Sequence, residues 1–284
     1  MIFYFSATGN SKRVAERLAE ATGEPLAPVA DLMRPNPTRD LEGEQSLVFE
    51  IDPHERIGIV TPVYFWRLPS IMADFLSAAT FRMTDAGESE HDPYTYCVLT
   101  YGAAPGGCSR FIAHALEAQG VKLSAAFGVT MPDTFTPLFD VSDAAKVERI
   151  VEQSERDIDD IAQLVQSKTR NERGAGEPSR VVGGVTRRLY DAARSCAKFH
   201  VDPMSCIGCG VCAESCPAQA IAMTPTPKTA NPDSADAPVT PTWTASRCAL
   251  CLGCLHRCPA FAISYGNGRA TSRHGQYANP RTRL

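Results

Sequence analysis

The 284-residue sequence has no run of about 18 consecutive apolar residues, so no membrane-spanning helix is predicted. Its first six residues have neither the basic start nor the long apolar stretch of a secretory leader, so we expect a cytoplasmic location. No segment interleaves basic and aromatic residues as a nucleic-acid-binding surface would, and nucleic acid is therefore not an expected partner.

Common catalytic patterns are missing as well. The triphosphate-binding pattern G-x4-G-K-[ST] and the dinucleotide-binding pattern G-x-G-x-x-G are both absent. The six histidines are scattered without metal-ligand spacing, and no Ser/His/Asp set or carboxylate pair can be argued. The sequence therefore predicts no catalytic residue, and it disfavours triphosphates and dinucleotides as ligands.

Cysteine, in contrast, is abundant, with eleven residues, and eight of them fall in two runs of identical spacing. Residues 206–217 and 248–259 both read C-x2-C-x2-C-x3-C-P, the bacterial run for a [4Fe–4S] cluster. Three cysteines at every third position wrap one cluster, and in two-cluster proteins the fourth ligates the other cluster. We therefore expect two interleaved quartets: Cys206, Cys209, Cys212 and Cys258; and Cys248, Cys251, Cys254 and Cys216.

These runs resemble the two-cluster bacterial ferredoxins over residues 200–268. Structural zinc is one alternative, but zinc sites use cysteine pairs and not two quartets that each end in Cys-Pro. A disulfide framework is the other, and it suits secreted chains rather than one without a leader.

A hydroxyl-rich loop follows the first predicted strand, residues 1–6. The helical spacing of Val14, Ala15 and Leu18 predicts a helix immediately after the loop. The N–H groups and positive dipole at a helix start, together with nearby hydroxyls, suit a phosphate monoester, although an ordinary helix cap is the alternative. The loop residues that we expect to contact the phosphate are Ser6, Thr8, Gly9, Asn10 and Ser11.

Residues 6–11 match the phosphate-loop pattern T/S-x-T-G-x-T of the flavodoxin family, with Ser in the last place, and the chain resembles this family. Strands and helices alternate beyond the loop, which predicts an α/β, doubly wound parallel sheet. The resemblance implies the strand order 2-1-3-4-5, with ligand at the carboxyl ends of the strands. Further strands are expected at 46–51, 56–61, 94–100 and 122–130, and helices at 69–79, 109–119 and 142–168.

The same resemblance implies FMN, with its ring flanked by residues 62–68 and 101–108. One of three consecutive aromatic residues would cover a face of the ring, and Tyr101 would lie near an edge; a local aromatic core is the alternative. The loop at 131–137 is expected near the flavin by resemblance alone. The ring-binding residues that we expect are Pro62, Val63, Tyr64, Phe65, Trp66, Tyr101, Gly102, Gly106 and Gly107.

Charge divides the chain. Residues 1–169 hold 14 Lys and Arg against 25 Asp and Glu, a net −11, whereas residues 170–284 hold 14 against 7, a net +7. The basic excess would offset cluster charge, about −2 for each cluster with its thiolates, or dock this half on the acidic one. We expect a flavodoxin-like domain at 1–169, a linker and basic helix at 170–199, a small α+β cluster domain at 200–268 and a basic tail at 269–284.

Two segments of the C-terminal half have open interpretations. The 31 residues between Cys216 and Cys248 are rich in proline and polar residues, which predicts an extended surface loop. The tail is either frayed or folded back over the acidic domain.

Three cysteines remain outside the quartets. Cys97 and Cys196 are interpreted as buried packing residues. Cys108 stands where a helix begins, which could lower its thiol pKa near the flavin, although burial as a small packing residue is favoured.

The whole chain resembles flavodoxin–ferredoxin fusion proteins. This implies electron transfer between two [4Fe–4S] clusters and FMN, serving redox partner proteins in anaerobic metabolism. The alternative is an FMN-dependent reductase of a quinone or other small acceptor, fed through the clusters, and whether the chain is an enzyme stays open. A redox sensor is a third hypothesis, for which the sequence offers no output surface. A homodimer is neither predicted nor excluded.

Overall fold

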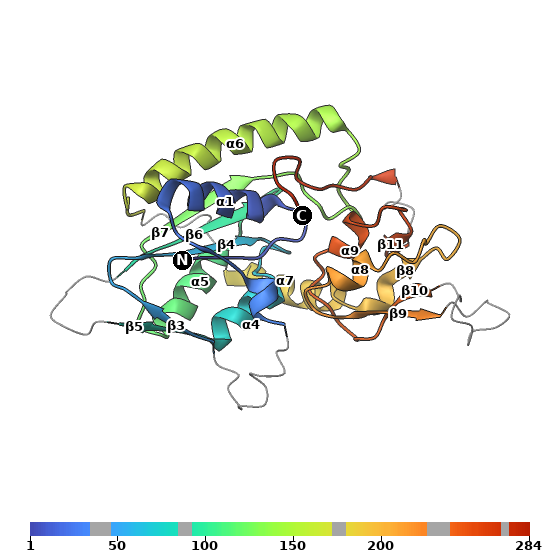
Figure 1. The fold of residues 1–284 in the computed structure, drawn as a ribbon, viewed down its shortest axis with the longest axis horizontal. Helices are drawn as coiled ribbons and strands as arrows, with labels where there is room; N and C mark the ends of the chain where they lie inside the picture. Colours follow the sequence, from blue (N-terminus) through green and yellow to red (C-terminus); the bar gives the residue numbers. More distant parts are fainter. Residues whose placement is uncertain (35–46, 85–92, 172–179, 226–238, 268–272) are drawn as a thin grey trace.

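The computed structural model describes residues 1–34, 47–84, 93–171, 180–225, 239–267 and 273–284. An α/β part forms the N-terminal half, and a smaller part with short strands and helices packs beside it (Figure 1). The predicted linker at 170–182 lies mostly outside the described residues. Within the described part, none of the helices is both long and apolar enough to cross a bilayer.

A five-stranded parallel sheet forms the centre of the N-terminal half. Its order is β2-β1-β4-β6-β7, which confirms the predicted doubly wound arrangement 2-1-3-4-5. The inner strands are almost wholly buried because helices cover both faces, as parallel sheets require. The strands are β1 (Ile2–Tyr4), β2 (Leu26–Pro28), β4 (Arg56–Pro62), β6 (Tyr94–Tyr101) and β7 (Ala125–Thr130).

Helices on the two faces build two separate apolar cores. On one face, α1 (Asn10–Thr22) and α6 (Ala144–Gln166) pack together over the sheet, with Val14 and Ile158 in the same core. On the other face lie α2 (Val29–Leu32), α4 (Ser70–Ala78) and α5 (Cys108–Glu117) (Figure 1). The two layers leave the carboxyl ends of the strands uncovered toward the smaller part.

The predicted strand at 46–51 forms, as β3 (Leu47–Ile51), but lies outside the central sheet. It pairs in parallel with β5 (Ala79–Met83), a strand that the sequence did not predict. Leu47 and Ile51 are buried while Val48 faces solvent, the pattern of a strand with one covered face. The central-sheet edge is taken instead by β2, which is only three residues long and carries too little periodicity to be predicted.

The C-terminal half contains two antiparallel strand pairs around two short helices. Strand β8 (Phe199–Val201) pairs with β11 (Ile263–Tyr265), and β9 (Ile221–Pro225) pairs with β10 (Val239–Trp243). The ends of the predicted surface loop between the cysteine runs are therefore a β-ladder, and its middle lies outside the described residues. The helices are α8 (Val211–Glu214) and α9 (Gly253–His256), with a 3-10 turn at Cys196–Lys198.

Two further segments connect the halves. Helix α7 (Arg180–Ala193) carries Tyr190, whose hydroxyl donates to the Ala249 carbonyl (2.9 Å) and accepts from the Ser70 N–H (3.1 Å). The last twelve residues, 273–284, pass beside α1 and α6 (Figure 1). The tail is thus folded back over the acidic half, one of the two outcomes that the sequence left open.

Candidate functional site

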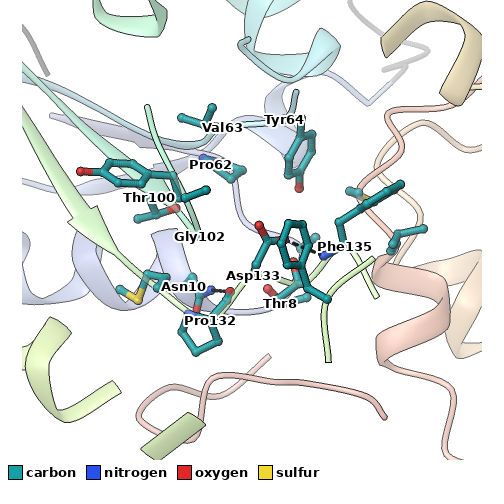
Figure 2. A pocket seen from close by; sticks show the side chains of 18 of the residues that line it. Thr8, Asn10, Pro62, Val63, Tyr64, Thr100, Gly102, Pro132, Asp133 and Phe135 are labelled. Carbon is teal, nitrogen blue, oxygen red and sulfur yellow. Dashed lines mark hydrogen bonds between the residues drawn. The ribbon is translucent and has the colours of Figure 1, made fainter. Parts of the chain in front are cut away.

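A cavity of about 190 Å³ opens at the carboxyl ends of β1, β4, β6 and β7 (Figure 2). This is the edge at which doubly wound sheets bind ligands. The loops after the four strands contribute its walls, and one stretch of the C-terminal half closes a side. The lining includes Ser6, Thr8, Asn10, Ser11, Pro62, Val63, Tyr64, Phe65, Trp66, Tyr101, Gly102, Asp133, Leu250, Cys251 and Leu252.

The loop between β1 and α1 is buried from Ala7 through Ser11. Ser6 Oγ accepts the Gly9 N–H (3.1 Å), and Ser11 Oγ lies 2.8 Å from Thr100 Oγ1. A helix leaves its first N–H groups without intrahelical partners. Among the described contacts, the backbone N–H groups of Asn10 and Ser11 have no acceptor, so they are available to an anion in the cavity.

A tight aromatic turn forms a second wall. Tyr64 and Arg67 exchange two backbone hydrogen bonds of 2.9 Å, and Phe65 and Trp66 between them have φ values of +52° and +59°. This backbone normally requires glycine or asparagine, so two bulky residues here store strain of about 1–3 kcal/mol each. Gly106 makes room for the turn, because a Cβ there would lie 2.6 Å from the Trp66 Cβ.

The three aromatic side chains of this turn have different surroundings. The Tyr64 ring projects into the cavity (Figure 2). Phe65 packs on Phe135 and Tyr190, with ring centroids 5.3 and 6.0 Å apart, and so reaches the core of the C-terminal half. Trp66 remains 46% exposed at the rim. The turn therefore lines the cavity and also contributes to a core, and contact of its rings with a flavin stays a prediction.

The loop after β7 places Asp133 inside the cavity. A Cβ at Gly102 would lie 2.4 Å from the Asp133 carboxylate, so glycine is required there for the carboxylate to fit. Burial raises the pKa of Asp133, and the N–H that Phe135 donates to it (3.0 Å) partly offsets this. The resemblance indicated only the loop at 131–137, and the signal for Asp133 itself is a carboxylate just beyond the last strand.

Three of the predicted flavin residues do not line the cavity. Gly9 and Gly107 precede α1 and α5, and Gly106 supports the aromatic turn. Cys108 begins α5 and is buried, and burial raises its thiol pKa, so the idea of a thiol with a lowered pKa was wrong.

The eight run cysteines surround two further cavities, four at each. One cavity is lined by Cys206, Cys209, Cys212 and Cys258, which we call the outer quartet. The other is lined by Cys216, Cys248, Cys251 and Cys254, which we call the inner quartet. Each run thus sends its fourth cysteine to the other group, in the interleaved arrangement expected from the spacing.

The donor set fits a cluster better than a single ion. Within the described residues, no three His, Cys, Asp or Glu side chains are placed to hold one metal ion. Zinc–sulfur bonds of about 2.3 Å would draw four thiolates close together, whereas a cubane separates them. Backbone N–H groups also donate to sulfur, from Ala220 to Cys216 and from Ala262 to Cys258, both at 3.3 Å.

The loops of the two cysteine runs have the same backbone conformation but place different residue types in it. The positions on either side of the second cysteine of each run are left-handed. Gly208 and Gly210 have φ values of +69° and +77°, and Leu250 and Leu252 both have φ +53°. The leucines are buried and line the cavity at the carboxyl ends of the central strands. The inner loop therefore accepts backbone strain where its side chains contact the N-terminal half.

Hydrogen bonds join the inner loop region to the first cavity. Arg257 donates from Nε and Nη2 to the Ala7 carbonyl (3.1 and 2.9 Å). The His256 Nδ1 accepts the Tyr277 N–H (3.1 Å), so its Nε2 carries the proton and donates to the Thr134 carbonyl (2.8 Å). Burial lowers the pKa of His256 to about 4, in agreement with this neutral tautomer. Cys251 itself lines the cavity.

A cavity at the strand ends of a doubly wound sheet, beside two cysteine quartets, is the arrangement of a flavin and iron–sulfur electron-transfer protein. Family comparison agrees: a flavodoxin domain model matches residues 1–159, and a 4Fe-4S dicluster domain model matches residues 205–262. The chain belongs to the flavodoxin domain family and is a fusion of such a domain to a ferredoxin domain.

Two crystal structures of proteins described as candidate flavoproteins are similar to the N-terminal half. The protein from Bacteroides uniformis ATCC 8492 is 17% identical, with a TM-score of 0.32, over 54% of this chain and 96% of its own. The protein from Bacteroides eggerthii DSM 20697 is 18% identical, with a TM-score of 0.26 and the same coverage. No curated protein matches the chain. The family implies FMN and iron–sulfur cofactors for this protein.

Proposed function

We propose that the chain is a single-molecule relay that passes electrons between two [4Fe–4S] clusters and FMN. The outer quartet would hold one cluster and the inner quartet the other. FMN would occupy the cavity at the strand ends, with its phosphate at residues 6–11 and its ring between the loops at 62–66 and 101–102. In this proposal, residues 1–169 form the flavin domain and residues 200–268 form the cluster domain.

The observation that carries the proposal is the position of Cys251. This cysteine belongs to the inner quartet and also lines the flavin cavity, together with the two leucines beside it. A ligand of the inner cluster would thus lie in the wall of the flavin site of the same chain. The electrons could then pass from cluster to flavin without a second copy of the protein.

The outer quartet supplies the opposite end of the relay. Cys209 is exposed, and so are the apolar side chains of Met204, Ile207 and Phe261, each within three residues of an outer-quartet cysteine along the chain. A redox partner protein of the ferredoxin type could bring its own cofactor close to this face. An exposed cluster is also vulnerable to oxygen, which supports a place in anaerobic metabolism.

Composition is tested on protein purified without oxygen. Two clusters and one flavin require about eight irons, about eight acid-labile sulfides and about one FMN per chain. Zinc in place of iron, or a chain that stays colourless after FMN is supplied, would contradict the proposal.

The order of the relay is tested by removing the outer cluster with Cys209→Ser. Flavin reduction by a reduced ferredoxin-type protein should slow at least tenfold, whereas reduction by dithionite, which needs no docking, should persist. Cys97→Ser, a change at a buried cysteine in the core of the central sheet, serves as the matched control. An unchanged rate in Cys209→Ser would mean that the partner reduces the flavin directly.

A second candidate, reduction of a quinone at the flavin, is favoured by Asp133. Its burial and raised pKa would let the carboxyl hold a proton that a quinone needs with each electron. If this is correct, the native chain turns over a soluble quinone with electrons from a reduced ferredoxin-type protein. Asp133→Asn should then lower kcat at least tenfold, and absence of turnover in the native chain rejects this candidate.

A further inference from the structure

The C-terminal segment, residues 273–284, runs from the cluster domain to the start of α1 (Figure 1). Its first part is fixed to the C-terminal half and to loops of the N-terminal half. Gln276 Nε2 donates to the carbonyls of Leu255 (2.7 Å) and Cys258 (3.1 Å). The Val141 N–H donates to the His274 carbonyl (2.9 Å), which completes a bridge between the halves.

Its second part contacts the phosphate loop directly. The Asn279 N–H donates to the Thr8 carbonyl (2.8 Å). Tyr277 Oη and Asn279 Nδ2 both donate to Asn10 Oδ1, at 2.7 and 3.1 Å. Tyr277, Asn279 and Asn10 are each less than 10% exposed, so these are buried hydrogen bonds whose loss leaves polar atoms unpaired.

Among the described contacts, none of these hydrogen bonds uses the backbone N–H groups of Asn10 and Ser11. The residue before α1 is Gly9, which has no side chain to accept the first helical N–H groups, and two donors from the C-terminal segment occupy Asn10 Oδ1. Gly9 is pressed against the segment, since a Cβ there would lie 2.9 Å from both Asn279 Cβ and Thr282 Cγ2. The loop conformation and the position of the segment therefore depend on each other.

The segment also brings positive charge. It contains Arg273 and Arg283, whereas its third arginine, Arg281, is paired with Glu148 and adds little net charge. Lys12, in the first turn of α1, donates to the Arg283 carbonyl (2.6 Å), which keeps this cation near the loop. The surroundings would favour a phosphate dianion more than an uncharged group.

We propose that the C-terminal segment is a structural part of the flavin-phosphate site. It holds the loop of residues 6–11 in the conformation that accepts a phosphate, so affinity for FMN, but not for riboflavin, depends on it. This inference rests on the proposed FMN site. It gives the C-terminal segment a function in cofactor retention that neither half would have alone.

The test uses the full chain carrying its clusters, freed of flavin, with Tyr277→Phe and Asn279→Ala combined. FMN should bind at least tenfold more weakly than to the native chain, while riboflavin, which lacks the phosphate, should change less than twofold. Arg281→Ala, which removes an exposed contact of the same segment with Glu148, is the matched control and should leave both affinities unchanged. Iron content and circular dichroism check that each variant is folded.

An equal loss of affinity for FMN and riboflavin would assign the segment a general stabilising role and overturn the inference, as would no loss for FMN. If the native chain binds neither flavin, the proposed function itself fails, which is a distinct result. Linkage gives a second readout, since binding couples both ways. FMN, but not riboflavin, should slow tryptic cleavage after Arg281 in the native chain, and equal protection by both would count against the inference.

Discussion

Single residues in the cavity occupy unfavourable states, and this marks it as functional more clearly than its shape does. Phe65 and Trp66 adopt left-handed backbone conformations, and Asp133 carries a carboxyl whose charge is disfavoured by burial. Such costs persist only where the surrounding structure enforces them. Gly106 and Gly102 make these states possible, because a Cβ at either position would collide with Trp66 or Asp133.

Asp133 should make stability fall as pH rises. Its folded pKa lies above the value of about 3.9 in the unfolded chain, so the native state favours the protonated form. The contribution of Asp133 to stability is therefore greatest below about pH 4 and declines until its folded pKa is passed. Asp133→Asn removes this decline. The difference in stability between the variant and the native chain should therefore favour the variant more at pH 8 than at pH 5. Anaerobic thermal unfolding measures this, and a gain that shrinks with rising pH contradicts it.

At the scale of elements, the two cluster loops differ in the residues that occupy the same left-handed backbone positions. The outer loop places glycine at both left-handed positions, and the inner loop places leucine. Left-handed backbone costs a non-glycine residue about 1–2 kcal/mol, whereas deleting a buried leucine side chain costs about 2–5 kcal/mol. Packing against the N-terminal half therefore outweighs the strain.

The comparison predicts that Leu252→Gly destabilises the protein although it relieves backbone strain. The expected net loss is about 1–3 kcal/mol from the difference between the two effects. Gly210→Ala adds backbone strain without a clash, since its Cβ would lie 3.7 Å from Glu214 Oε1, and it should cost about 1–2 kcal/mol. Anaerobic thermal unfolding of both variants, with iron content as a check, measures the order. A more stable Leu252→Gly variant would show that the leucine contact is weak.

Elements differ in how far the sequence determined them. The quartets and the loop at residues 6–11 could be predicted because their chemistry is written in local spacing. Strands β2 and β5 could not, because three to five residues give little periodicity and their pairing is set by tertiary packing. Local spacing did not specify the positions of Asp133 and the C-terminal segment either, because Asp133 faces Gly102 on another loop and Asn279 contacts Asn10, 269 residues earlier in the chain.

At the scale of the whole molecule, the charge asymmetry suggested electrostatic docking of the two halves. The described contacts are of another kind. Cations of each half donate to backbone carbonyls of the other, as Arg257 does to Ala7 and Arg34 to Glu214 (3.2 Å), and Phe65 enters the core of the C-terminal half. Among the described residues, Arg281–Glu148 is the ion pair that joins the two halves.

Contacts of this kind predict that electron exchange within the molecule is insensitive to salt. Raising ionic strength from 0.1 to 1 M shortens the screening length from about 10 to about 3 Å, which weakens exposed charge pairs but not buried hydrogen bonds. After rapid photoreduction of the holoprotein, the first-order rate of cluster-to-flavin transfer should change less than twofold over this range. The second-order rate of reduction by a charged partner protein serves as the control, because it reports encounter at the surface and should vary with salt. A several-fold fall in the first-order rate would instead mean that the acidic and basic halves are held together by their opposite charges. Long-range attractions beyond the Arg281–Glu148 pair would then contribute to the contact between the halves.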